Sequence, residues 1–258
     1  MSVGTGGVEY ESKVMSIISQ QIQNTNLKIK ESGTAAFSAA EPDLALIRKA
    51  NNARINIEIK QDRDAQMGGG SYNYDMNSGK FYVSAKTEID PGINDKIIDI
   101  LDSKKNSLDK LLDHTKEIDP PELSSKITGL PLKATKASWE ELTKQKYLVP
   151  LNGKVAVTSS FLHQHYHKKN CYYIQIGGAG LYYLYSNPLN LPIPQLRVNM
   201  NVELRLGRAG SKMDGKLRQE IATGNIRAQG RLDAKMLVSS PYSLDTPGHF
   251  EKLFGTVH

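Results

Sequence analysis

The sequence has little of several features that would assign a chain to a particular class of protein. It contains one cysteine, Cys171, so it cannot form an intrachain disulfide framework. A reducing compartment fits that composition. No apolar run approaches the roughly 20 residues that a transmembrane helix needs, and residues Met1 to Gly7 lack the charged-then-apolar layout of a signal peptide. We therefore expect a cytoplasmic protein.

Two further absences exclude particular architectures. No internal repeat of solenoid period is present. The glycines at 68–70 are not followed by Gly-Lys-Ser/Thr, so they are not a Walker loop, and we interpret them as a flexible loop. What remains is ordinary for a soluble globular protein, with 258 residues, 39% hydrophobic residues and 23% charged residues. A chain of this length can bury a core without cross-links.

The charge balance favours a polyanionic partner. The formal net charge is +6, and basic side chains gain binding free energy when they release counterions from phosphates. Many basic proteins never contact nucleic acid, so the sign of the charge is supporting evidence only.

The first half of the chain reads as a helix followed by a hairpin. Apolar residues recur at helical spacing from about Val8 to Ile29. A short apolar run, Leu44 to Ile47, then precedes the alternating segment Arg54 to Lys60, in which three isoleucines point to one side. Asn51-Asn52 between them tolerates turn geometry, so the two strands form a predicted hairpin.

The rest of the chain predicts a β-rich second half. A strand at 80–85 and a helix at 93–116 come first, and Asp119-Pro120-Pro121 ends that helix. Later segments indicate a helix at 160–169 and strands at 172–176, 181–185, 197–206 and 217–232. We therefore expect an α/β core at 1–120, a linker or irregular segment at 121–150, and a β-rich part at 151–258.

The predicted hairpin brings together side chains that suit phosphodiester hydrolysis. Glu58 and Lys60 are two residues apart on one strand, so they project from the same face. Asp43 precedes the neighbouring strand, and the start of one hairpin strand lies beside the end of the other. Two carboxylates can hold a hard cation such as magnesium, and a lysine can stabilise developing negative charge.

This pattern resembles the signature of the PD-(D/E)XK nuclease superfamily. Pro42-Asp43 is followed, after fourteen residues, by Glu58-Ile59-Lys60. The similarity covers about residues 8 to 90, and it implies a restriction-endonuclease-like α/β fold with a mixed sheet flanked by helices.

The resemblance also implies roles for individual residues. Asp43 and Glu58 would hold Mg²⁺, with Mn²⁺ able to substitute, and Lys60 would act on the nucleophile. Many members carry an acidic residue on the preceding helix, and Glu11 suits that place because it lies on the apolar face of the predicted helix. Gln66 follows Lys60 at a spacing where some members use a glutamine to support the site.

Basic residues in the second half are candidates for contacts to DNA. His163, His165 and His167 would share a face on a strand and suit zinc, whereas on a helix they would fan out. The nearby lysines and the lack of paired cysteines argue against a zinc site, which leaves a basic patch with Lys168 and Lys169 that faces DNA, or an ordinary surface. The densest basic stretch lies further along, and its candidates for phosphate contacts are Arg205, Arg208, Lys212, Lys216 and Arg218.

The sequence therefore predicts a metal-dependent DNA endonuclease of restriction-like or phage type. A recombination or repair nuclease, such as a junction resolvase or an exonuclease, is the alternative within the class. A non-catalytic DNA-binding protein with a degenerate nuclease fold, or an assembly protein without a DNA role, lies outside it. The oligomeric state is not fixed by the sequence, and a homodimer stays open.

Overall fold

The computed structural model describes residues 5–30, 42–65, 67, 69–75, 78–84, 91–107, 109–110, 133–134, 140–141, 143–146, 152–210 and 224–255. The chain forms two compact units, each built from separated segments. The first comprises Met1–Met67, Val157–Met200 and Asp233–His258, and the second comprises Gly68–Ala156 and Asn201–Leu232. The predicted division into a core at 1–120, a linker at 121–150 and a β-rich part at 151–258 stays a prediction.

The first unit is organised around a five-stranded mixed sheet. Its strand order is β1-β2-β3-β8-β9, with bounds β1 Leu27–Ile29, β2 Leu44–Arg48, β3 Arg54–Lys60, β8 Cys171–Ile176 and β9 Gly180–Tyr183. The central pair β3–β8 is parallel, and the other pairs are antiparallel. Three helices accompany the sheet: α1 (Thr5–Gln21), α5 (Ser159–Lys168) and α6 (His249–Phe254). The predicted α/β class, a mixed sheet flanked by helices, is confirmed.

The predicted hairpin is confirmed as β2 and β3. Leu44 lies opposite Ile57, and Leu46 opposite Ile55, in an antiparallel ladder. The turn depends on Asn52, whose φ of 55° lies in the left-handed region that asparagine tolerates better than most residues. This short connection fixes the register of the two strands, and with it the position of every side chain on them.

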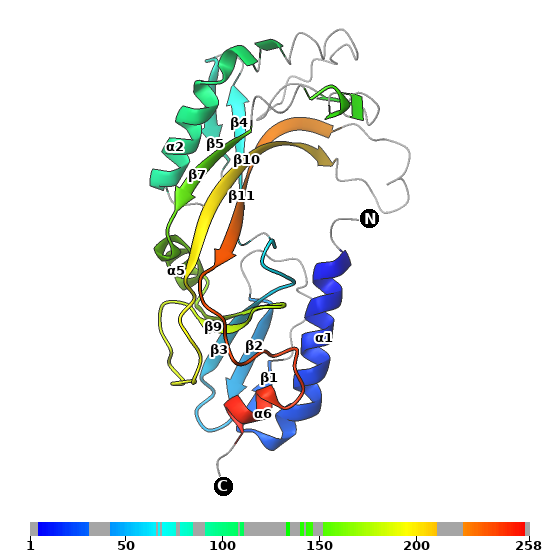
Figure 1. The fold of residues 1–258 in the computed structure, drawn as a ribbon, viewed down its shortest axis with the longest axis vertical. Coiled ribbons are helices and arrows are strands. Elements are labelled where there is room, and N and C mark those ends of the chain that lie inside the picture. Colours follow the sequence, from blue (N-terminus) through cyan, green and yellow to red (C-terminus); the bar gives the residue numbers. More distant parts are fainter. Residues whose placement is uncertain are drawn as a thin grey trace. The chain divides into compact units, whose positions relative to one another are not determined.

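One face of this sheet carries the apolar core of the unit. Val14 and Ile18 of α1 are fully buried and pack in one cluster with Ile57, Ile59 and Phe250. Figure 1 shows α1, in blue, running along the strands, with α6 beside it. Because side chains alternate along a strand, the residues between these isoleucines point to the opposite face.

The predicted helix at 8–29 is wrong beyond Gln21. A 3-10 turn, η1 (Ile22–Asn24), ends the helix, and the Thr25 hydroxyl donates to the Ile22 carbonyl at 2.8 Å. The apolar residues that extend the helical pattern instead form β1, in which Leu27 lies opposite Arg48. Pairing with a neighbouring strand therefore overrides the local periodicity.

The described part of the second unit contains a six-stranded sheet and a helix of 12 residues. The strand order is β5-β4-β11-β10-β7, and β6 also pairs with β11. The bounds are β4 Gly69–Asp75, β5 Lys80–Val83, β6 Lys133–Ala134, β7 Gly153–Val157, β10 Val198–Gly210, β11 Gly224–Met236 and α2 Pro91–Asp102. Residues 111–116 of the predicted second helix lie outside the described residues. None of the helices in the described ranges is long and apolar enough to cross a membrane.

The predicted glycine-rich loop at 68–70 is wrong at Gly69 and Gly70, which begin strand β4, and Gly68 lies outside the described residues. They lie opposite Arg231 and Gly230 of β11. Glycine weakens an isolated strand, so the extended conformation here comes from the ladder with β11. That partner is more than 150 residues away in the sequence, which local pattern cannot reveal.

Candidate active site

The side chains of Glu58 and Lys60 meet on the face of the sheet opposite α1. Both lie on β3 and flank Ile59, which is buried in the core on the other face. The Lys60 ammonium donates to Glu58 Oε1 at 2.5 Å. The side chain of Glu58 is 7% exposed and that of Lys60 is 17% exposed, so this is a largely buried ion pair.

Asp43 completes the arrangement from the neighbouring strand. Leu44 is opposite Ile57, so the register places Asp43 beside Glu58. Asp43 Oδ2 accepts a hydrogen bond from the Ile59 main-chain nitrogen at 2.7 Å and lies 3.9 Å from Lys60 Nζ. The three side chains predicted from the sequence therefore converge around the Lys60 ammonium.

This cluster holds more negative than positive charge. Burial, and then the charge of Glu58, raises the pKa of Asp43 above its ordinary value, against the lowering effects of Lys60 and the Ile59 hydrogen bond. Burial lowers the pKa of Lys60, but the carboxylates of Glu58 and Asp43 outweigh it, and the net pKa is raised. The lysine is thus held in its charged form, whereas the charged form of Asp43 is disfavoured.

Glu11 of α1 is half-buried near this cluster. Burial raises its pKa, and the next largest cause is the negative charge of Asp43, so the two carboxylates lie within each other's field. Within the described ranges, no group of three or more histidine, cysteine, aspartate or glutamate side chains is arranged to hold a metal ion. The role of Glu11 as a further metal ligand stays a prediction.

Helix α5 forms a second wall of the site, which the sequence did not reveal. Tyr166 is fully buried, donates its hydroxyl hydrogen to the Met67 carbonyl at 2.9 Å, and lies close to Glu58. Its pKa is raised well above its ordinary value, by burial first and then by the charges of Glu58 and Asp43. The phenol therefore stays protonated and can act as a donor. Lys169, predicted as a DNA contact, is half-buried, and its charge lowers the pKa of Asp43.

Cys171 begins β8 in the same buried neighbourhood. Burial raises the pKa of its thiol to about 12, with Glu58 and Asp43 acting in the same direction, so the thiolate is disfavoured. A nucleophilic role would need the opposite shift. Cys171 is a packing residue here.

The histidines lie on α5 and fan out as expected for a helix. His165 is buried, His163 is half-buried and His167 is exposed. They do not share one face, so they form no common set of metal ligands. Of the neighbouring lysines, Lys168 is exposed at the end of α5.

Several predicted residues cannot be placed. Gln66 lies outside the described residues, as do Lys212, Lys216 and Arg218. Strand β10 carries Arg205 and Arg208, but their side chains are not among the described ones. These assignments stay predictions.

Comparison with known proteins adds little to this picture. No protein-family model matches the sequence, and no curated protein has a significantly similar sequence. Among solved structures, HhaI endonuclease in complex with DNA is similar to this chain, with a TM-score of 0.45 and 11% identity, over 89% of this chain and 92% of that chain. So distant a likeness assigns neither a family nor an activity to this chain.

Proposed function

We propose that this chain is a metal-dependent DNA endonuclease that hydrolyses phosphodiester bonds. The observation that carries the proposal is that the carboxylates of Asp43 and Glu58 both lie beside the Lys60 ammonium. A phosphodiesterase needs a site for a cation and a positive charge near the phosphate. The resemblance to the PD-(D/E)XK signature gives the same assignment independently of the contacts.

The residues present suit a magnesium ion. Asp43 and Glu58 offer hard carboxylate oxygens, and the raised pKa of Asp43 reflects its burial first and the negative charge of the neighbouring Glu58 second. A divalent cation would offset that negative charge, and we assign Asp43, Glu58 and Glu11 as its ligands. When bound, Mg²⁺ or Mn²⁺ would supply an acidified water and stabilise the charge on the phosphate oxygens.

Lys60 has a role that follows from its protonation state. Because its pKa is raised, it carries a proton at neutral pH and cannot serve as a general base. It acts instead as a fixed positive charge that orients water or stabilises the phosphate in the transition state. Tyr166 orients Glu58 from the side of α5.

Basic side chains would hold the DNA backbone. We assign this role to the predicted set of Lys168, Lys169, Arg205, Arg208, Lys212, Lys216 and Arg218. Replacing one lysine that binds a phosphate should reduce the log–log slope of affinity against salt concentration by about one. Lys168 is the most accessible test, because it is exposed and lies next to the half-buried Lys169.

Plasmid cleavage tests the proposal. We expect nicking or cutting of supercoiled DNA with MgCl₂ or MnCl₂, and none with EDTA. Asp43→Asn and Glu58→Gln should each abolish cutting, whereas Asp64→Asn should not. Asp64 is a matched control because it is exposed four residues beyond Lys60 in the same unit.

The outcomes separate the alternatives. Cutting of linear ends or branched junctions in preference to plasmid would indicate a recombination or repair nuclease. Salt-dependent binding without cutting of supercoiled, linear, branched or single-stranded DNA would refute the proposal and indicate a binding protein with a degenerate site. Sedimentation of the protein with and without DNA would test for a homodimer.

A further inference from the structure

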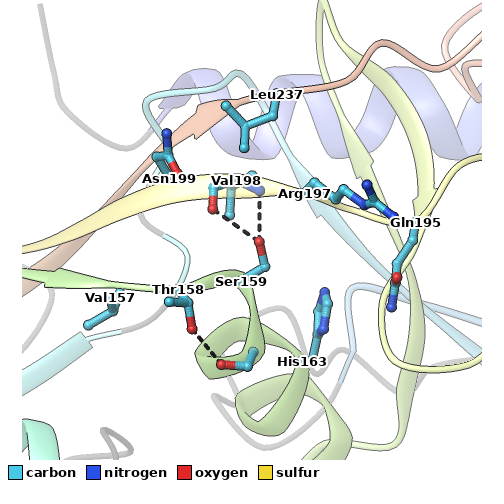
Figure 2. A pocket seen from close by; sticks show the side chains of 10 residues that line it. Val157, Thr158, Ser159, His163, Gln195, Arg197, Val198, Asn199 and Leu237 are labelled. Carbon is cyan, nitrogen blue, oxygen red and sulfur yellow. Dashed lines mark hydrogen bonds between the residues drawn. The ribbon is translucent and has the colours of Figure 1, made fainter.

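The first unit contains a pocket away from the carboxylates. It has a volume of about 460 Å³ and lies between the start of α5 and the segment that enters β10. Figure 2 shows Ser159 and His163 on the α5 side, with Arg197 and Asn199 on the strand side. None of these side chains belongs to the candidate active site.

One wall of the pocket is a row of side chains suited to hydrogen bonding. Gln195, Arg197 and Asn199 alternate with the buried Leu196 and Val198, so they share the outer face of an extended segment. Arg197 and Asn199 are exposed. Among the described residues, neither forms a side-chain hydrogen bond or ion pair, so the fold makes no evident use of their donors and acceptors.

The main chain beneath this row is held firmly. The Ser159 hydroxyl accepts from the Val198 nitrogen at 2.9 Å and donates to the Val198 carbonyl at 3.0 Å. The Arg197 carbonyl accepts from the Leu237 nitrogen at 3.0 Å. A fixed backbone holds side chains at set spacing, which recognition of a ligand requires.

The remaining lining has an orienting role. Gln195 donates through its Nε2 to the Leu184 carbonyl at 2.9 Å, which fixes its amide. His163 Nε2 lies 3.1 Å from the Leu196 carbonyl. Leu237 is 53% exposed and adds an apolar surface at the rim.

We propose that this pocket reads the edges of DNA bases, with Arg197 and Asn199 as the residues that determine sequence preference. Arginine pairs with two acceptors of guanine, and asparagine pairs with a donor and an acceptor of adenine. Leu237 is suited to the methyl group of thymine. The inference rests on the proposed function, because it needs DNA as the substrate.

The position of the pocket along α5 fits this role. Ser160 lines the pocket, and Tyr166 contacts the candidate active site six residues further along the same helix. Six residues of helix span about 9 Å, which is close to three base pairs at roughly 3.4 Å each. The two positions on α5 are therefore separated along the helix by a distance that one duplex can span.

Selection from a random-sequence duplex library tests the inference. The full-length protein would be assayed twice, for cleavage with MgCl₂ and for binding with CaCl₂, and the recovered sequences compared. Arg197→Ala should weaken discrimination at one guanine position by roughly 5- to 150-fold, the range of a bidentate contact. Asn199→Ala should do so at one adenine position.

Two variants serve as controls. Arg197→Lys keeps the charge but loses the planar fork, so it should lose the preference while the salt dependence of binding stays unchanged. Asn201→Ala removes the next exposed side chain of the same strand, which does not line the pocket, and should leave the preference intact.

The results distinguish this inference from the proposed function. Cutting with a sequence preference that Arg197→Ala and Asn199→Ala leave unchanged, or cutting without any preference, would overturn the inference alone. Sequence-selective binding that depends on Arg197, without cutting, would support the inference and overturn the nuclease. Absence of both binding and cutting would overturn the two together.

Discussion

Replacing Lys60 with methionine should destabilise the protein strongly when no metal is present. Its ammonium lies 2.5 Å from Glu58 Oε1, and both side chains are more than four-fifths buried. Coulomb's law with an effective dielectric constant near 20 gives a gross attraction of about 7 kcal/mol at that distance. Desolvation offsets part of it, and removal of one partner of a buried pair costs about 3–5 kcal/mol because the other charge is left alone.

Thermal melting in EDTA measures this cost. For a chain of this size, 1 kcal/mol shifts the Tm by roughly 2–4 °C, so Lys60→Met should melt about 6–20 °C lower. Lys28→Met on the exposed outer strand β1 should stay within about 0.5 kcal/mol of the parent. CaCl₂ should raise the Tm of Lys60→Met more than that of the parent, because a divalent cation replaces the positive charge that the substitution removes from beside Glu58 and Asp43.

A Lys60→Met variant that melts with the parent in EDTA would refute the buried-pair reasoning. Equal melting of both proteins in EDTA, combined with no response to calcium in either, would also remove the argument for a cation site at these carboxylates. A calcium response that persists in Asp43→Asn would place the ion elsewhere.

The raised pKa values of Asp43 and Glu11 mean that the folded protein binds their protons more tightly than the unfolded chain does. The free energy of unfolding without metal should therefore fall as the pH rises above about 4. Urea titrations at several pH values should show that this free energy depends less steeply on pH in Asp43→Asn than in the parent, and an equal dependence would contradict the prediction. Tyr166→Phe and Tyr173→Phe should each lower the free energy of unfolding by about 1 kcal/mol. Only Tyr166→Phe should raise the magnesium concentration for half-maximal cleavage. Tyr173 is the control because it donates to Asn187 and packs in the core on the other face of the sheet. The Cys171 thiol, with its pKa raised to about 12, should resist iodoacetamide until urea unfolds the protein, and rapid labelling of the folded chain would contradict its burial.

The carboxylate pair and Lys60 could be predicted because they depend on short-range structure. A connection of five residues separates β2 from β3, and Asn52 supplies the left-handed turn. Once the hairpin forms, alternation decides which side chains face Asp43. The relative positions of Asp43, Glu58 and Lys60 could therefore be predicted from the hairpin alone.

Tyr166 could not be predicted in the same way. It reaches Glu58 because α5 packs on β8, and β8 pairs in parallel with β3 more than 100 residues earlier in the sequence. Local periodicity places Tyr166 on a helix but does not say which strand that helix will cover. A buried tyrosine in a predicted helix gives no signal that its hydroxyl faces a carboxylate.

The differences at β1 and β4 have the same cause. Leu27 continues the apolar spacing of α1, and Gly70 has low strand propensity, yet both take part in ladders with distant partners. Where helix or loop propensity and strand pairing disagreed, pairing decided the outcome. The hairpin that carries the candidate site was predicted correctly because strand propensity, turn chemistry and strand pairing all favour the same structure there.

The site also shows how the sequence balances folding against function. Asp43 and Glu58 are largely buried, and Lys60 is the close positive charge beside both of them. Two carboxylates beside one ammonium leave an excess of negative charge, which selection for stability alone would remove. Replacing Asp43 with asparagine would relieve its repulsion with Glu58 while leaving the Glu58–Lys60 pair in place, and the expected loss of cleavage would then accompany an unchanged or higher stability. An incidental surface Glu/Lys pair would show neither effect, because water screens exposed charges. Opposite changes in stability and activity at Asp43 would therefore argue more strongly for a functional site than loss of activity alone.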